Sequence, residues 1–119
     1  MPGYITRDEL WAKIKRGDDF VLLDTLAPSS YAYGHLPGAL NLPPDDVKRR
    51  AYELIPSRDT EIVVYCGNRD CHASILVANE LAGLGYTSVL DYLDGKADWK
   101  QAGLPMETSE RGPAETGDA

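Results

Sequence analysis

The sequence predicts an α/β fold in which a central parallel sheet carries helices on both of its faces. Continuous apolar runs at residues 20–24 and 61–65 are typical of strands that are covered on both sides. Helical patterns separate these runs, and strands that alternate with helices form parallel sheets. The hydrophobic fraction of 43% is enough for one core in a chain of 119 residues.

A capping box predicts the first helix. Thr6 can accept a hydrogen bond from the Glu9 amide, and the Glu9 side chain can reach back to the Thr6 amide. Gly17 is a suitable residue to end this helix. Its apolar face consists of Leu10, Trp11 and Ile14.

The next elements are short. Residues 20–24 are predicted to form a strand, 28–33 a turn or short helix, and 39–42 a brief strand. A second clear helix starts at Pro44 or Asp45, because acids in a first turn interact favourably with the helix dipole, and it ends before Pro56.

The second half continues the alternation. Residues 61–65 form the strongest predicted strand, residues 66–71 a polar loop, and residues 72–84 a helix that is apolar on nearly every side and therefore expected to be mostly buried. A strand at 87–92 and a helix at 97–101 follow. We expect one domain over residues 1–107 and a disordered acidic tail over residues 108–119, where apolar residues are few.

Composition excludes several function classes. The net charge is −7, and the single basic cluster, Lys48 to Arg50, lies among acidic residues, so no nucleic-acid partner is expected. No apolar run has transmembrane length and no signal peptide is recognisable, so no membrane association is expected. The two cysteines are only five positions apart, which favours a reducing, cytoplasmic location. Nothing requires more than a monomer.

Cys66 is the candidate nucleophile. It follows the predicted strand 61–65 directly, and ligands of parallel α/β sheets bind beyond the carboxyl ends of the strands. The positive end of the following helix and the loop amides from Gly67 to Cys71 could converge on one anion and lower the pKa of this thiol from its usual value of about 8.5.

The other polar residues of the loop have several possible roles. Arg69 adds a forked cation suited to an oxyanion, whereas Asp70 opposes anion binding unless it faces solvent or pairs with Arg69. Cys71 could pack at the helix start or act as a resolving thiol that forms a disulfide with Cys66. His35 and His72 are expected to be structural, and their spacing from the cysteines is not that of a zinc site.

At this point the sequence resembles the rhodanese family over residues 6–107. Three blocks carry the resemblance: LLD at 22–24 followed by YAYGHLPGALNLP at 31–43, IVVYC at 62–66, and YLDGKADWKQAGLP at 92–105. The resemblance implies a three-layer rhodanese-like domain with a central parallel sheet, in which Cys66 is the catalytic, persulfide-bearing residue. It also implies a six-residue substrate-binding loop that consists of Cys66, Gly67, Asn68, Arg69, Asp70 and Cys71.

Two positions depart from the common family pattern. Many members have Arg two positions after Asp24, where this chain has Leu26, and many end the loop with Arg, where this chain has Cys71. Related phosphatases have a longer loop that ends in Arg. His72 occupies that seventh position here, so no phosphatase activity is expected.

The resemblance therefore predicts a thiosulfate sulfurtransferase. A small sulfur-containing anion would give its outer sulfur to Cys66, and the persulfide would pass that sulfur to a thiol, cyanide or a protein, without a metal or organic cofactor. Two alternatives remain open: a protein-to-protein sulfur carrier, and a redox-sensing or binding module that uses Cys66 and Cys71.

Overall fold

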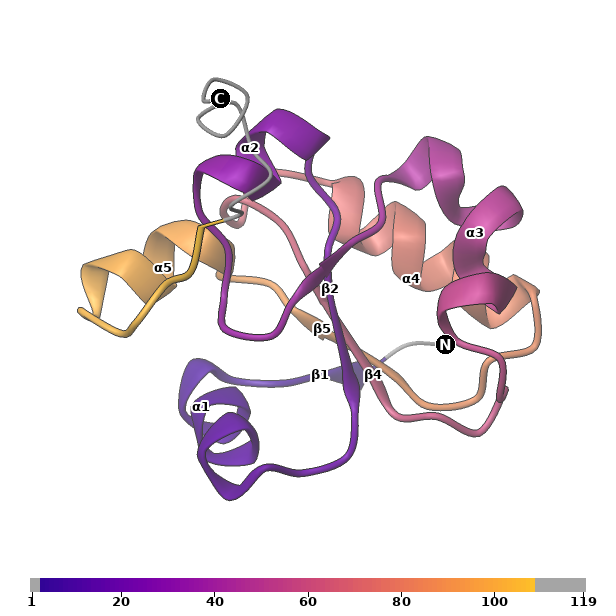
Figure 1. Cartoon of the computed structure of the whole chain (residues 1–119), viewed down its shortest axis with the longest axis horizontal. Coiled ribbons are helices and arrows are strands. Elements are labelled where there is room, and N and C mark those ends of the chain that lie inside the picture. Colours follow the sequence, from indigo (N-terminus) through magenta and orange to yellow (C-terminus); the bar gives the residue numbers. More distant parts are fainter. Residues whose placement is uncertain (1–2, 109–119) are drawn as a thin grey trace, which may run out of the picture.

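The computed structural model describes residues 3–108, and these form a five-stranded parallel sheet with strand order β1-β5-β4-β2-β3 (Figure 1). The elements are, in chain order, β1 (Gly3–Tyr4), α1 (Arg7–Arg16), β2 (Val21–Asp24), α2 (Pro28–Tyr33), β3 (Leu40–Asn41), a 3₁₀ turn (Pro44–Asp46), α3 (Val47–Leu54), β4 (Ile62–Tyr65), α4 (Ala73–Gly83), β5 (Val89–Tyr92) and α5 (Gly95–Gln101). Apart from its first residue, the expected acidic tail at 108–119 lies outside the described residues. The predicted α/β class is confirmed.

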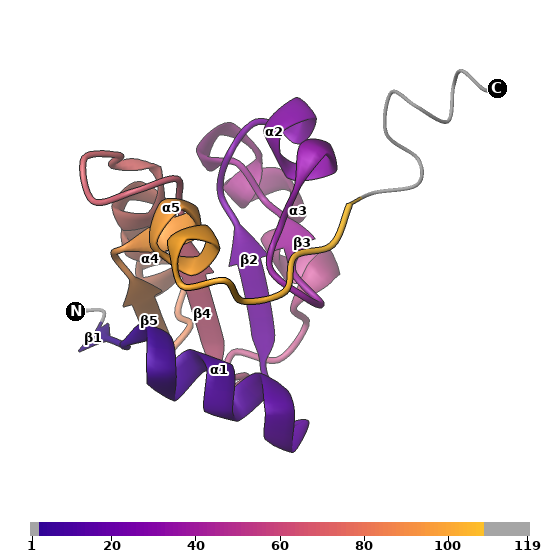
Figure 2. The ribbon, with the colours of Figure 1, turned by 90° about the vertical axis from the view of Figure 1, so that its left-hand side faces the viewer.

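Two helices cover each face of the sheet. Helices α1 and α5 lie on one face, and α3 and α4 lie on the other (Figures 1 and 2). Figure 2 shows α2 near the carboxyl end of β2, at the same end of the sheet as the loop between β4 and α4. Because all five strands are parallel, their carboxyl ends lie at the same end of the sheet, and the loops that follow them begin there. The candidate nucleophile lies at this end.

The capping box is present as predicted. The Thr6 hydroxyl accepts from the Glu9 amide at 3.2 Å, and the Glu9 carboxylate accepts from the Thr6 amide at 3.0 Å. Gly17 ends α1 in the left-handed conformation with φ of 72°. The edge strand β1 was not predicted, because two residues beside β5 carry too little periodicity to indicate a strand.

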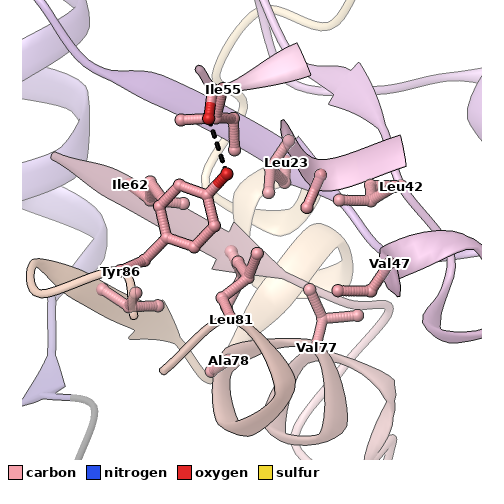
Figure 3. Close-up of a cluster of buried hydrophobic side chains, with 12 residues drawn as sticks. Leu23, Leu42, Val47, Ile55, Ile62, Val77, Ala78, Leu81 and Tyr86 are labelled. Atoms are coloured by element: carbon pink, nitrogen blue, oxygen red, sulfur yellow. Dashed lines mark hydrogen bonds between the residues drawn. The ribbon is translucent and has the colours of Figure 1, made fainter. Parts of the chain in front are cut away.

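The expectation that α4 would be mostly buried is wrong on one side. Val77, Ala78 and Leu81 pack against the sheet and α3, as Figure 3 shows for the whole cluster. Ile75 and Leu76 are 40% and 54% exposed, because no further layer covers the outer side of the helix. Apolar residues on all sides of a helix therefore predict that at least one side is buried. They do not show whether other elements cover the remaining sides.

Candidate active site

Cys66 lies immediately beyond the carboxyl end of β4, and its position is fixed by the neighbouring strand. It is 1% exposed, and Tyr65 before it is fully buried. The Tyr65 carbonyl accepts two hydrogen bonds from Thr25, one from the amide at 3.1 Å and one from the hydroxyl at 2.8 Å. The backbone that leads into the loop is thus tied to the end of β2.

The first turn of α5 binds the backbone of the first two loop residues. The amides of Lys96 and Ala97 donate to the carbonyls of Cys66 and Gly67, at 2.9 and 2.8 Å. The first turn of a helix has free amides, and here they bind backbone of the active loop. Gly95 makes this contact possible: a Cβ at this position would lie 2.6 Å from the Cys66 carbonyl oxygen.

Asn68 shapes the rest of the loop into a tight turn. Its side-chain oxygen accepts from the Asp70 amide at 2.9 Å, and its backbone oxygen accepts from the Cys71 amide at 3.2 Å. The turn brings Cys71 back to Cys66, and the two form a disulfide with a Cα–Cα distance of 6.3 Å. The pairing brings the two cysteines together, and the role of Cys71 as a resolving thiol stays a prediction.

In this disulfide-linked form the five loop amides do not all converge on one anion site, as the sequence predicted they could. The amides of Asp70 and Cys71 are engaged by Asn68 and do not converge on Cys66. The amides of Gly67, Asn68 and Arg69 have no protein acceptor within residues 3–108. Asparagine side chains often accept a hydrogen bond from the amide two residues further on. We did not predict from the sequence that Asn68 would bind the Asp70 amide in this way.

Arg69 pairs with Asp94, whereas from the sequence we considered Asp70 as its partner. Its Nε donates to Asp94 Oδ1 at 2.6 Å, and this hydrogen bond raises the pKa of Arg69. Asp70 is exposed to solvent, which is one of the two arrangements that limit its repulsion of an anion. An oxyanion would therefore have to compete with Asp94 for the Arg69 guanidinium.

Asp24 is the centre of a buried polar network beside the loop. This fully buried carboxylate accepts from the Tyr65 hydroxyl at 2.8 Å and from the Leu26 amide at 2.9 Å. Lys96 Nζ lies 3.5 Å from Asp24 Oδ2 and also donates to the Ser30 carbonyl at 3.2 Å. Burial, followed by the Asp24 charge, raises the pKa of Tyr65, so the phenol stays protonated as a donor.

Sequence reasoning missed the position of Lys96. Its side chain, 14% exposed, borders a hollow of about 440 Å³ that is also lined by Leu26, Ser29, Ser30 and Tyr33. Leu26 Cδ1 lies 4.0 Å from where a Gly67 Cβ would be, so the hollow lies beside the loop. A cation therefore lies next to Leu26, the position where many family members have Arg. Only the family block at 92–105, which contains Lys96, could have indicated it.

Asp91 is a second buried acid near the loop. It is 2% exposed, and Oδ1 has no hydrogen-bond partner among the described residues. Burial raises the pKa of this carboxyl, and a hydrogen bond from Ser74 opposes the rise. Together with Tyr4, Arg69 and Asp94, Asp91 lines a smaller hollow of about 180 Å³ on the other side of the loop from Lys96.

The histidines have the structural surroundings expected of them. His35 is buried, stacks on Tyr31 with ring centroids 3.9 Å apart, and has Nδ1 2.7 Å from the Tyr31 carbonyl. His72 is exposed and occupies the N-cap position of α4 without a side-chain capping bond. Among the hydrogen bonds of residues 3–108, none joins either histidine to Cys66.

Among the described helices, none has the length and apolar character needed to cross a membrane.

Comparison with known proteins identifies the domain family. The family model of the rhodanese-like domain matches residues 6–102. A sulfurtransferase of Allochromatium vinosum is 30% identical over 112 residues, which cover 92% of this chain and 99% of that protein. An HTH-type transcriptional regulator of Mycobacterium tuberculosis is 35% identical over 103 residues, which cover 87% of this chain and 44% of that protein. This chain thus spans less than half of the regulator.

Solved structures place the fold in the same group. The crystal structure of a thiosulfate sulfurtransferase from Pseudomonas aeruginosa superposes with a TM-score of 0.80 at 26% identity, covering 90% of this chain and 20% of that one. The chain belongs to the rhodanese-like domain family. Sulfur transfer is the chemistry that this family membership supports.

Proposed function

We propose that this protein is a sulfurtransferase that carries sulfur as a persulfide on Cys66, with thiosulfate as a donor. The observation that carries the proposal is the position of Cys66: a buried sulfur at the carboxyl end of β4, in a loop held by α5 and followed by the N-terminus of α4. The positive end of an eleven-residue helix favours a thiolate over a thiol.

The reaction has two steps once the disulfide is reduced. The Cys66 thiolate attacks the outer sulfur of thiosulfate, the S–S bond of thiosulfate breaks, and sulfite leaves with the bonding electron pair. A thiol or protein acceptor, or cyanide as a surrogate, then attacks the outer sulfur of the persulfide and restores the Cys66 thiolate. The amides of Gly67, Asn68 and Arg69, which have no acceptor among the described residues, stabilise the negative oxygens of the donor together with the Lys96 ammonium.

A single-turnover experiment tests this function. Fully reduced, desalted protein is mixed with thiosulfate under argon, and the sulfite released is measured. We expect one sulfite per protein, and none from the Cys66→Ser variant. If the wild type releases no sulfite from thiosulfate and gains no sulfur from a cysteine desulfurase, the proposed function fails. Faster loading from the desulfurase than from thiosulfate would instead identify a protein-to-protein carrier.

A second function is favoured by one specific observation. The disulfide between Cys66 and Cys71 could serve as the signal of a redox-sensing module, and one relative is a transcriptional regulator. Sulfite release separates the two functions, because a module that only senses oxidants forms the disulfide with peroxide but takes no sulfur from thiosulfate.

A further inference from the structure

The partner of Cys66 in the structure lies within the active loop itself. Cys66 is 1% exposed, whereas Cys71 is partly exposed on the rim of the loop. The Cα–Cα distance of 6.3 Å lies within the range of about 4.4–6.8 Å that a direct disulfide needs. Cys71 can thus place its sulfur against the Cys66 sulfur without any movement of the sheet or helices.

Two features hold Cys71 in that position and favour its reactive form. The two hydrogen bonds to Asn68 fix the turn between the cysteines. Cys71 also directly precedes His72, the N-cap of α4, so the positive end of that helix favours its thiolate as it does that of Cys66. A thiolate held beside a reactive sulfur reacts as an intramolecular group, at an effective concentration far above that of a free thiol.

We propose that Cys71 discharges the Cys66 persulfide within the loop and releases hydrosulfide. The Cys71 thiolate attacks the inner sulfur, which belongs to Cys66, and a Cys66–Cys71 disulfide forms. The bond between the inner and outer sulfur breaks, and the outer sulfur leaves with the electron pair. It takes up the proton that the Cys71 thiol gave up and becomes hydrosulfide, so no external oxidant is needed. This step rests on the proposed function, since it starts from the persulfide.

The step gives the protein a further activity. It converts the outer sulfur of thiosulfate into free sulfide and leaves the protein as the disulfide seen in the structure. A second turnover then requires a dithiol reductant, which reopens the disulfide by thiol–disulfide exchange. An external acceptor must react before Cys71 does, so the balance between sulfur delivery and sulfide release depends on how fast Cys71 attacks.

The test is a single turnover without reductant under argon, with Cys71→Ser as the matched variant. We expect the wild type to release one sulfide for each sulfite and to end two hydrogens lighter than the reduced protein. The Cys71→Ser protein should release sulfite, keep one extra sulfur and release no sulfide. An Asn68→Ala variant should lower the ratio of sulfide to sulfite, because one of the two hydrogen bonds that fix the turn is lost.

The outcomes separate this inference from the proposed function. If the wild type keeps its extra sulfur and releases no sulfide, as Cys71→Ser does, the role of Cys71 is overturned and the sulfurtransferase stands. If neither protein releases sulfite, thiosulfate transfer fails. The persulfide is then made with inorganic polysulfide and desalted, and loss of the extra sulfur with disulfide formation in wild type alone still supports the Cys71 step, whereas retention in both overturns it.

Discussion

The two faces of the sheet are built from different side chains. We call the side under α3 and α4 the aliphatic face, because its buried cluster is Leu23, Leu42, Val47, Ala51, Ile55, Ile62, Val64, Val77, Ala78, Leu81, Tyr86 and Val89 (Figure 3). We call the side under α1 and α5 the aromatic face, because Tyr65, Tyr92 and Trp99 are its largest buried side chains. Tyr86 on the aliphatic face also binds a carbonyl, that of Ile55, at 2.6 Å.

The difference shows which face organises the site. On the aromatic face the hydroxyls of Tyr65 and Tyr92 donate to Asp24 and Asp98, and the Trp99 indole donates to the Pro105 carbonyl. These bonds have defined directions, whereas aliphatic packing constrains volume more than orientation. The helix that supports the active loop, α5, belongs to the aromatic face. We therefore expect substitutions there to change activity and substitutions on the aliphatic face to change mainly stability.

The largest expected effect is that of Gly95→Ala. The new Cβ would lie 2.6 Å from the Cys66 carbonyl oxygen, so the loop must shift away from α5. A misplacement of about 1 Å at a reacting group costs on the order of 100-fold in rate. We expect sulfite release from thiosulfate to slow by about that factor while the protein still unfolds cooperatively.

Gly103→Ala is the matched control for the same experiment. Gly103 has φ of 75°, close to the 68° of Gly95, but apart from its chain neighbours no atom of the described residues lies within 4 Å of where its Cβ would be. Both variants therefore bear a similar backbone cost, and only one contacts the loop. Equal rates in the two variants would show that α5 does not hold the loop in a reactive position.

A smaller effect is expected when one hydroxyl is removed from each face. Tyr65→Phe leaves the buried Asp24 with one donor fewer and removes the acceptor of the Leu36 amide, which lies 3.0 Å from the hydroxyl. Tyr86→Phe removes only the bond to the Ile55 carbonyl. We expect the free energy of unfolding to fall by about 2 kcal/mol and about 1 kcal/mol, respectively. Denaturant titration measures both losses, and sulfite release from thiosulfate should slow in Tyr65→Phe alone. Equal slowing in the two variants would contradict the different roles given to the two faces.

The sequence predicted the parts of the fold that depend on local chemistry. The capping box, Gly17 and the apolar runs that became β2 and β4 each depend on residues close together in the chain, and the structure confirms them. Cys66 is predicted as the nucleophile because it follows a buried strand in a parallel sheet, and the structure places it at the end of β4.

The contacts that shape the site were not predictable in the same way. The bonds from α5 to the loop join residues about thirty positions apart, and the Lys96–Asp24 pair spans β2 and α5. No period or spacing within one element encodes such pairs. The competition of Asn68 for two loop amides is local, but it depends on which side-chain rotamer closes the turn, and residue types alone do not decide that.

Lys96→Met tests the hollow on the aromatic side of the loop. Removing the ammonium takes a charge-assisted contact from the donor anion, so we expect the KM for thiosulfate to rise about tenfold, which corresponds to about 1.4 kcal/mol. The control is Lys100→Met on the same helix, because Lys100 is exposed and does not line the hollow. A folded Lys96→Met enzyme with an unchanged KM would exclude the hollow as the donor site.

The smallest effect concerns Asp91, a buried acid on the aliphatic face. Burial raises the pKa of Asp91 above its ordinary value, so the folded protein holds this proton more tightly than the unfolded chain does. The contribution of Asp91 to the free energy of unfolding is therefore greatest below the unfolded pKa of about 3.9 and falls as pH rises through the raised value. Above that value a charged carboxylate remains buried with one oxygen that has no partner within residues 3–108, at a cost of at least about 1 kcal/mol.

Asp91→Asn should remove this dependence, because a neutral amide has no proton to lose. The free energies of unfolding at pH 4 and pH 8 are compared in the wild type, in Asp91→Asn and in Asp59→Asn, which changes the net charge equally at an exposed position. We expect the free energy of unfolding at pH 4 minus that at pH 8 to be smaller in Asp91→Asn than in the wild type, and to change less in Asp59→Asn. An equal change in both variants would mean that net charge, and not the buried acid beneath the start of α4, sets the pH dependence of this face.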